Sequence, residues 1–228
     1  MTLARYTDLI KCLPYLDQAF ETKKANWPVK EGGNTAFQEF HNKCFVTETY
    51  KLSRADLFEV CKYNFHDAIF SVIFWGYPRN MRGNNFSSIL NSLTAIEQAL
   101  GTPCNLSAAE FIAMCEKLKN TGVGLSTLSK FLYFFDYTLE GHRCLILDKR
   151  IIDIINYPGG FKEMKSLSLK DGINEFNKNK KYVAYLQLME DLSNSNGYMP
   201  DQLEFFLFSM GMNLKPSKEP AFKPHSLT

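Results

Sequence analysis

Two glycines enclose a single apolar residue at Gly122-Val123-Gly124, between two segments that are predicted to be helical. Glycine tolerates positive φ and leaves the backbone N–H groups uncovered, while Val123 can pack between the helices. The turn amides and the positive end of the second helix would then face one phosphate of a nucleic-acid backbone. The carbonyls of Leu118, Asn120 and Val123 would suit a monovalent cation, K⁺ or Na⁺, that bridges to this phosphate. The alternative is an ordinary αα-hairpin, because Gly-x-Gly turns are common.

The segments that must position this turn carry apolar residues at helical spacing, as does most of the chain. Ser107 and Glu110 fit a capping box ahead of the helix that precedes the turn. Sustained alternation of apolar and polar residues is missing, and Arg143–Leu147 comes nearest to it. The predicted helices are Asp56–Trp75, Phe86–Leu100, Ser107–Lys119, Ser126–Phe135, Lys149–Ile155, Tyr182–Asn194 and Pro200–Phe208. We expect an all-α fold, a compact helical domain built as one body or as two lobes with a cleft.

Composition narrows the class of protein. The chain has 228 residues, 45% apolar and 14% aromatic, which is enough for a sizeable core and excludes a disordered protein. Its 26 Lys and Arg against 24 Asp and Glu exclude a polybasic nucleic-acid coat but allow a local basic face. The longest apolar stretches reach only about half of a bilayer span, and charges interrupt the N-terminal segment. We therefore expect a soluble, cytoplasmic protein.

The six cysteines and four histidines are scattered, without the spacing of a zinc site, an iron–sulfur cluster or a Ser-His-Asp triad. Without a secretory signal, a disulfide framework is not expected, and buried reduced thiols are. The sequence predicts no cofactor apart from the structural K⁺ or Na⁺ at the turn.

The stretch Leu118–Asp148 resembles the helix-hairpin-helix of the base-excision DNA glycosylase superfamily. That pattern has an apolar residue, a short turn, Gly-Val-Gly and a helix, and the catalytic aspartate follows after an extended apolar segment. Here Asp148 stands 24 residues after Gly124, behind Cys144–Leu147 and at the start of a predicted helix. Length and helical pattern resemble most the 8-oxoguanine DNA glycosylase-like (OGG-like) bacterial branch. The likeness at the level of motifs covers 31 residues.

The resemblance implies a domain organisation. Residues 1–214 would form a single helical glycosylase-like domain, with the hairpin at 108–135 and the catalytic segment at 143–156. Residues 215–228 would form a loose C-terminal tail.

The resemblance also implies a catalytic role for Asp148. Cleavage of an N-glycosidic bond builds positive charge on the sugar, and a carboxylate nearby stabilises that charge and orients water. At about 4 Å and an effective dielectric near 20, the attraction is roughly 4 kcal/mol, or about a thousandfold in rate. The alternative is a helix N-cap worth about 1 kcal/mol, and both roles are compatible.

The residues expected to bind DNA are Gly122, Val123, Gly124, Ser126, Thr127, Lys130 and Lys149. Bifunctional members of the family carry a nucleophilic lysine two residues after the second hairpin glycine. Ser126 stands there instead, which implies a monofunctional enzyme. Lys130 and Lys149 could act as amine nucleophiles, although phosphate contacts at the surface are the favoured interpretation.

A target base must leave the duplex to reach a buried carboxylate, so a pocket is needed. The segment 74–82 offers aromatic rings for stacking, with arginines and an amide to bind a base edge or a phosphate. The predicted pocket residues are Trp75, Tyr77, Arg79, Asn80 and Arg82. Trp75 could instead belong to the core, and Gln202 or Phe205 could also line the pocket.

Together these features predict a monomeric glycosylase that acts on double-stranded DNA, flips out a damaged or modified base and leaves an abasic site. A base modified by phages would make it a defence protein, whereas a damaged base would make it a repair enzyme. The alternatives are a non-catalytic DNA-binding or lesion-sensing protein that keeps the hairpin, and a helical interaction protein that ignores DNA.

Overall fold

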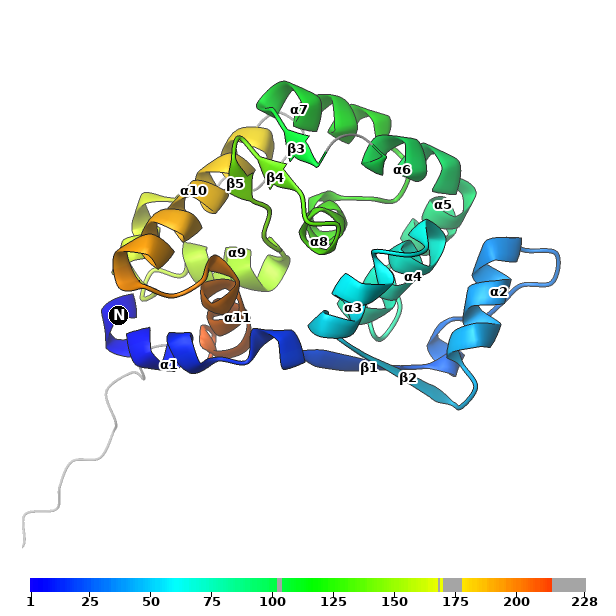
Figure 1. The fold of residues 1–228 in the computed structure, drawn as a ribbon, viewed down its shortest axis with the longest axis horizontal. Coiled ribbons are helices and arrows are strands. Elements are labelled where there is room, and N and C mark those ends of the chain that lie inside the picture. Colours follow the sequence, from blue (N-terminus) through cyan, green and yellow to red (C-terminus); the bar gives the residue numbers. More distant parts are fainter. Residues whose placement is uncertain (102–103, 168, 170–177, 215–228) are drawn as a thin grey trace, which may run out of the picture.

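The protein is predominantly helical, as the sequence predicts (Figure 1). The computed structural model describes residues 1–101, 104–167, 169 and 178–214. The predicted tail, 215–228, lies outside the described residues. None of the helices described is long and apolar enough to cross a membrane.

The N-terminal part contains two strands that the sequence pattern did not predict. β1 (Ala19–Lys23) pairs with β2 (Thr49–Ser53) in an antiparallel ladder that sets Phe20 opposite Leu52. Burial along these strands does not alternate cleanly, so period-two patterning is weak. The elements around them are the 3₁₀ turns Leu3–Tyr6, Tyr15–Asp17 and Lys24–Asn26, and the helices α1 (Thr7–Cys12) and α2 (Thr35–Cys44).

The predicted helix Asp56–Trp75 is in fact two helices. α3 (Arg54–Val60) begins at a capping box formed by Ser53 and Asp56, and α4 (Phe65–Gly76) begins at Asn64. The Asn64 side chain accepts a hydrogen bond from the backbone of Asp67, which starts a new helix where the apolar spacing continues. The predicted helix Phe86–Leu100 is likewise divided, into α5 (Asn85–Asn91) and α6 (Leu93–Leu100).

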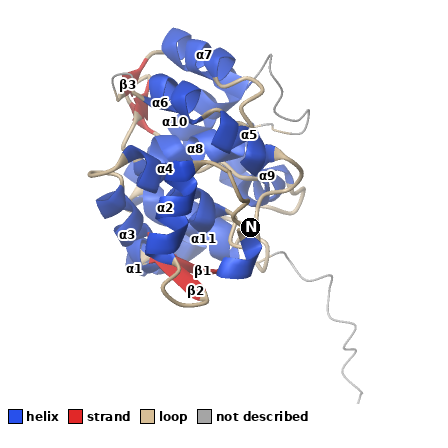
Figure 2. Ribbon diagram, turned by 90° about the vertical axis from the view of Figure 1, so that its right-hand side faces the viewer, coloured by secondary structure: helices blue, strands red, loops and turns tan. Residues whose placement is uncertain are grey.

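The middle of the chain places α8 (Leu125–Phe134) at the centre of the molecule (Figure 1). It follows α7 (Ala108–Lys117), whose predicted capping box at Ser107 and Glu110 is confirmed, and it packs against α4. The short strands β3 (Asn105–Leu106), β4 (Thr138–Leu139) and β5 (His142–Arg143) form a second sheet. Figure 2 shows the two sheets at opposite ends of the helical body.

The C-terminal part packs against the chain's first residues. It consists of α9 (Lys149–Asn156), the 3₁₀ helix Lys162–Ser166, α10 (Lys178–Asn196) and α11 (Pro200–Met210). The ammonium group of Met1 donates to Gly160 O at 3.1 Å, and α11 packs against α1, α9 and α10. α11 begins at Pro200, as predicted. Elements from both ends of the sequence therefore meet, since α1 lies beside α11 (Figure 1).

Candidate active site

A cavity of about 310 Å³ lies among β1, α3, α4, α8, α9 and α11. We call it the Asp148 cavity. Its lining combines aromatic rings with charged side chains that are far apart in the sequence: Phe20, Arg54, Trp75, Gly76, Pro78, Lys130, Ile146, Asp148, Arg150, Glu204 and Phe208. The volume is at the lower end of the range for small-ligand pockets, which suits a single planar ring system.

Asp148 is half-buried in this cavity and caps α9. Its Oδ1 accepts a hydrogen bond from Ile151 N at 3.1 Å, so the N-cap alternative is confirmed. The cap fixes the orientation of the carboxyl group and engages one of its two oxygens, so the same geometry is compatible with a second role.

The extended segment before Asp148 is buried and is fixed by side chains from two helices. Each of three hydrogen bonds holds one backbone group. Leu147 N donates to Ser129 Oγ at 3.1 Å, Tyr182 Oη donates to Leu145 O at 2.7 Å, and Tyr185 Oη donates to Ile146 O at 3.0 Å. This arrangement anchors Asp148 to α8 and α10.

Lys130 lies inside the Asp148 cavity and is only 4% exposed, whereas the sequence pattern favoured a surface phosphate contact. Its Nζ donates to Ser126 O and Ser126 Oγ, both at 3.1 Å, and stands 5.1 Å from the ring centre of Tyr77. A Cβ on Gly76 would come within 2.7 Å of Lys130 Cδ, so the glycine makes room for this side chain. The amine therefore lies close to the Ser126 side chain, one helical turn from its own backbone.

Arg54 and Glu204 form a fully buried ion pair in the wall of the cavity, with Nη2 and Oε2 2.6 Å apart. The other two guanidinium nitrogens also make hydrogen bonds: Nε donates to Gln18 Oε1 at 2.6 Å and Nη1 to Tyr133 Oη at 3.1 Å. Burial alone would lower the pKa of Arg54, but the carboxylate beside it raises the pKa above its ordinary value.

Glu204 is less completely satisfied than its partner. Its Oε1 is buried and has no hydrogen-bond partner among the described residues. Complete burial raises the pKa of the Glu204 carboxyl to about 7, although Arg54 opposes the shift.

Trp75 lines the cavity together with Phe20 and Phe208, and it is also a buried residue of the hydrophobic core. The two interpretations of this residue from the sequence, pocket or core, are therefore compatible. Its indole Nε1 donates to Gln18 O at 3.3 Å, and its ring meets that of Phe20 edge-on at 5.1 Å. The guanidinium of Arg150 lies 4.6 Å from the ring centre of Phe208. The cavity thus offers aromatic surfaces beside a carboxylate.

The predicted hairpin consists of α7, the turn 118–124 and α8. Gly122 has φ +85°, and a Cβ there would clash with the carbonyl oxygen of Asn85, so this position requires glycine. Gly124 is exposed and has φ −81°, and a Cβ added to it would meet no atom within 4 Å, so its backbone is open to an approaching group. Helix geometry leaves the amides of Leu125 and Ser126 without an intrahelical partner at this exposed end.

The carbonyls expected to bind a cation are not all available. Leu118 O accepts hydrogen bonds from Thr121 N at 3.2 Å and from Thr121 Oγ1 at 2.6 Å, which engages both lone pairs. Leu118 O is therefore already engaged, while the K⁺ or Na⁺ expected at the carbonyls of Leu118, Asn120 and Val123 stays a prediction.

Tyr77, which was predicted to line the base pocket, contacts Thr127, which was predicted to bind DNA. Tyr77 Oη and Thr127 Oγ1 are 2.7 Å apart, and Thr127 is buried, which joins the predicted pocket segment to the start of α8. Lys149 extends from the exposed side of α9 and bonds Asp153 at 2.9 Å. Its predicted contact with DNA stays a prediction.

Arg79, Asn80 and Arg82 are exposed and do not line the Asp148 cavity. The turn that carries them is held on the N-terminal part of the chain, because Pro78 O accepts hydrogen bonds from Thr22 Oγ1 and Asn26 Nδ2, both at 2.8 Å. The structure thus separates these three from Trp75, and their predicted role in a base pocket has no support in this geometry.

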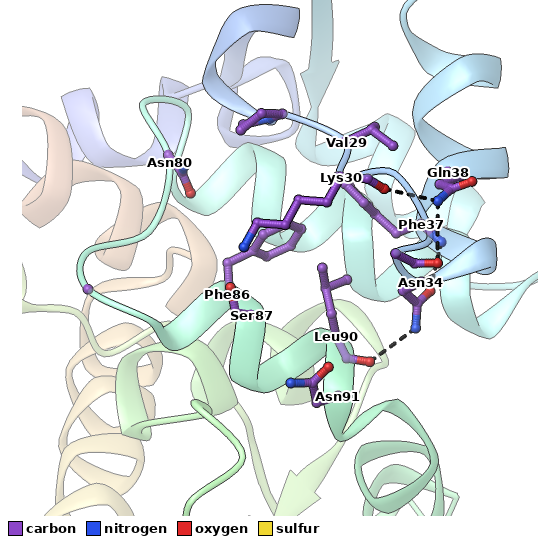
Figure 3. A pocket seen from close by; sticks show the side chains of 13 residues that line it. Val29, Lys30, Asn34, Phe37, Gln38, Asn80, Phe86, Ser87, Leu90 and Asn91 are labelled. Atoms are coloured by element: carbon purple, nitrogen blue, oxygen red, sulfur yellow. Dashed lines mark hydrogen bonds between the residues drawn. The ribbon is translucent and has the colours of Figure 1, made fainter.

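Asn80 instead borders a second cavity, of about 270 Å³, between α2 and α5. We call it the α2–α5 cavity. Figure 3 shows its polar lining, in which Asn34 Nδ2 donates to Leu90 O at 3.0 Å and Gln38 Nε2 donates to Lys30 O at 3.3 Å.

Sequence reasoning missed Arg54 and Glu204. Arg54 lies just before the predicted helix Asp56–Trp75, and Glu204 lies inside the predicted helix Pro200–Phe208, where the residues singled out were Gln202 and Phe205. Glu204 follows Leu203 and precedes Phe205, so a charged residue inside an aromatic run was the available signal. No group of three His, Cys, Asp or Glu among the described residues could hold a metal ion.

A family model described as "Putative 8-oxoguanine DNA glycosylase OGG-like protein" matches residues 14–208. Comparison with curated proteins and with solved structures gives no match. The matched range contains the hairpin and every residue that lines the Asp148 cavity.

Proposed function

The chain belongs to the family of OGG-like putative 8-oxoguanine DNA glycosylases, and on this premise we propose that it is a monofunctional glycosylase. It flips one damaged or modified base out of double-stranded DNA and hydrolyses the bond between base and deoxyribose. The observation that carries the proposal is a fixed carboxylate, Asp148, beside aromatic rings in a cavity of the size of one base.

In this mechanism the base leaves with the electron pair of its bond to the sugar, and positive charge develops at C1′. The Asp148 carboxylate stabilises that charge, worth about 4 kcal/mol at 4 Å and an effective dielectric of 20. A water molecule, oriented by the same carboxylate, then bonds through its oxygen to C1′ and loses a proton, the departing base gains a proton, and the products are a free base and an abasic site. The cap to Ile151 prevents the carboxyl group from turning away.

The hairpin supports a DNA-binding role. The exposed backbone at Gly124 and the amides at the start of α8 suit one phosphate, because the N-terminus of a helix carries partial positive charge. Lys130 and Asp148 both line the cavity, so α8 joins the phosphate site to the site of bond cleavage.

One observation favours a second candidate step. The amine of Lys130 lies 3.1 Å from Ser126 Oγ, next to the position where bifunctional relatives carry their nucleophilic lysine. An amine there could attack C1′ in place of water and form an imine with the opened sugar. Borohydride reduces such an imine to a stable adduct of protein and DNA. Trapping by the unaltered protein and loss of trapping in Lys130→Gln would establish a lyase and overturn the monofunctional proposal.

The central experiment exposes the unaltered protein and Asp148→Asn to DNA carrying damaged bases and bases modified by phages. Released bases are identified by mass spectrometry, and alkali then reveals abasic sites. Asn caps helices about as well as Asp, so this variant keeps the fold while removing the charge. We expect release of a base by the unaltered protein, a loss of about a thousandfold in Asp148→Asn, and unchanged affinity for DNA.

Asp153→Asn is the matched control, because Asp153 is an exposed carboxylate on the same helix. It should retain full activity. Full activity of Asp148→Asn would contradict the mechanism, and tight binding of DNA without release from any substrate would favour the non-catalytic alternative.

A further inference from the structure

Glu204 has a polar atom that nothing in the described structure satisfies. Its side chain is 0% exposed and lines the Asp148 cavity, and its Oε1 has no hydrogen-bond partner there. An unsatisfied buried acceptor costs folding free energy, and native proteins seldom retain one without a bound water, ion or ligand to satisfy it.

Among the described residues, no donor in the cavity wall reaches this oxygen. The three guanidinium nitrogens of Arg54 are engaged by Gln18, Tyr133 and the other oxygen of Glu204. The ammonium of Lys130 is directed to Ser126. Oε1 is therefore left as an acceptor for a donor that enters the cavity.

Resting on the proposed function, we propose that Glu204 Oε1 accepts a hydrogen bond from the exocyclic amino group of the flipped base. The cavity then selects amino-bearing bases, such as derivatives of guanine, cytosine or adenine, over counterparts without that group. The aromatic walls formed by Phe20, Trp75 and Phe208 stack on any base and give no such selection. Glu204 would thus be the residue that sets specificity, while Asp148 performs the cleavage.

The selection should be large because the acceptor is buried and charged. A base that lacks the donor would enter the cavity and leave Oε1 unsatisfied, as the empty cavity does. Hydrogen bonds to charged groups in such sites correspond to about 10- to 100-fold in affinity.

The test measures binding in an Asp148→Asn background, with a 2′-fluorinated sugar that further prevents cleavage. The probes are duplexes whose bases differ in a single amino group: guanine and hypoxanthine, adenine and purine, cytosine and 2-pyrimidinone. Each base is placed opposite an abasic analogue, so that differences in base pairing do not contribute. Fluorescence anisotropy gives the affinity for each duplex.

We expect the amino-bearing member of at least one pair to bind about 10- to 100-fold more tightly. Adding Glu204→Gln should reduce that ratio to about threefold or less, because the glutamine oxygen faces Arg54 and presents an amide donor in place of Oε1. Glu163→Gln is the matched control: Glu163 also has a buried oxygen without a partner, but it does not line the cavity, so the ratio should persist.

Loss of the charge beside Arg54 could unfold Glu204→Gln, so thermal unfolding is recorded for each variant. Glu204→Asp keeps a negative charge beside Arg54, but its shorter side chain moves the carboxylate oxygen away from the base. It should therefore also reduce the ratio of the two affinities. Equal affinity within every pair when Glu204 is intact overturns the proposal without any variant. A ratio that survives both Glu204 substitutions also overturns it.

Failure of this inference differs from failure of the proposed function. If the protein releases bases and Glu204 does not affect the ratio, the glycosylase stands and the specificity residue is wrong. If no base is released and no flipped base is bound, both proposals fall.

Discussion

The Asp148 cavity and the α2–α5 cavity are similar in volume, about 310 and 270 Å³, but differ in their chemistry. Five ionisable side chains line the first: Arg54, Lys130, Asp148, Arg150 and Glu204. The second has a single charged residue, Lys30, among neutral amides and apolar groups (Figure 3). The volumes alone therefore do not indicate which of the two cavities is the better candidate for an active site.

The amides of the α2–α5 cavity serve the fold. Asn34 caps α2 by accepting from Phe37 N at 2.9 Å and also donates to Leu90 O, while Gln38 donates to backbone carbonyls. In the Asp148 cavity, by contrast, buried charges are held close together at a cost in folding free energy. Proteins retain such costly groups most often at functional sites.

The largest expected effect is the difference in the rate of base release when one charged side chain is removed from each cavity in turn. Asp148→Asn should lower the rate of base release about a thousandfold, because the developing charge at C1′ loses its counter-ion. Lys30→Met should change the rate less than about twofold, because surface substitutions away from such groups have small effects. Single-turnover release of the base measures both. A large loss in Lys30→Met would break the comparison and assign chemistry to the second cavity.

The next effect is a pH dependence that belongs only to the charged cavity. Burial raises the pKa of Glu204 to about 7, so the carboxyl loses its proton as pH rises through that value. Only the ionised form is a pure acceptor, so the preference for amino-bearing bases should grow about tenfold from pH 6 to pH 8. Anisotropy with the guanine and hypoxanthine duplexes measures this ratio.

Several other charged groups act on Glu204, and their effects must be separated from its own. They are Arg54 on α3, Asp148 before α9, Asp201 on α11, and Lys130 and Arg150 elsewhere in the cavity wall. Glu204→Gln supplies the reference, because its ratio should not change with pH. Since the folded state holds this proton more tightly than the unfolded state, the contribution of Glu204 to stability falls as pH rises from about 4.5 to 7. A flat ratio in the protein with Glu204 would contradict the assignment.

Local signals were enough to predict the helices that carry the site. Capping residues and apolar spacing fixed the starts of α7, α9 and α11 within a residue or two. These signals did not predict the break between α3 and α4, because the apolar spacing continues across Cys61–Asn64 and hides the N-cap of α4 at Asn64. The β1–β2 ladder was missed because its stability depends on a partner about 30 residues away.

The site was predictable only where one segment contains it. The turn at Gly122 and the cap at Asp148 could be predicted, because each depends only on the types and spacing of residues within one short segment. Arg54 and Glu204 are 150 residues apart, and only the fold brings them together beside Asp148. The sequence likewise did not show that Lys130 turns inward, because Gly76, which makes room for it, lies on another helix.

Replacing one glycine of each cavity by alanine should lower the rate of base release in one case and the stability of the fold in the other. In Gly76→Ala the new Cβ would displace the flexible end of Lys130, so we expect the fold to persist and base release to fall about fivefold. In Gly83→Ala the Cβ meets no atom within 4 Å, but φ is +63°, so stability should fall by about 1–2 kcal/mol. Base release in Gly83→Ala should not change. Denaturant unfolding and single-turnover release measure the two effects, and the reverse pattern would contradict the placement of Lys130.

The smallest effect lies outside both cavities, at the exposed start of α8. Gly124→Asp adds a carboxylate where the backbone conformation permits any residue and space is open. An N-cap aspartate should stabilise the helix by a few tenths of a kcal/mol, yet its charge competes with a DNA phosphate for the same amides. We expect a slightly higher Tm together with about threefold weaker binding of undamaged duplex at low salt.

Gly124→Asn is the control, because it caps the helix equally well without a charge and should bind DNA as the unaltered protein does. Equal loss in both variants would mean that bulk, and not charge, closes the site, whereas no loss in either would remove the phosphate from the hairpin.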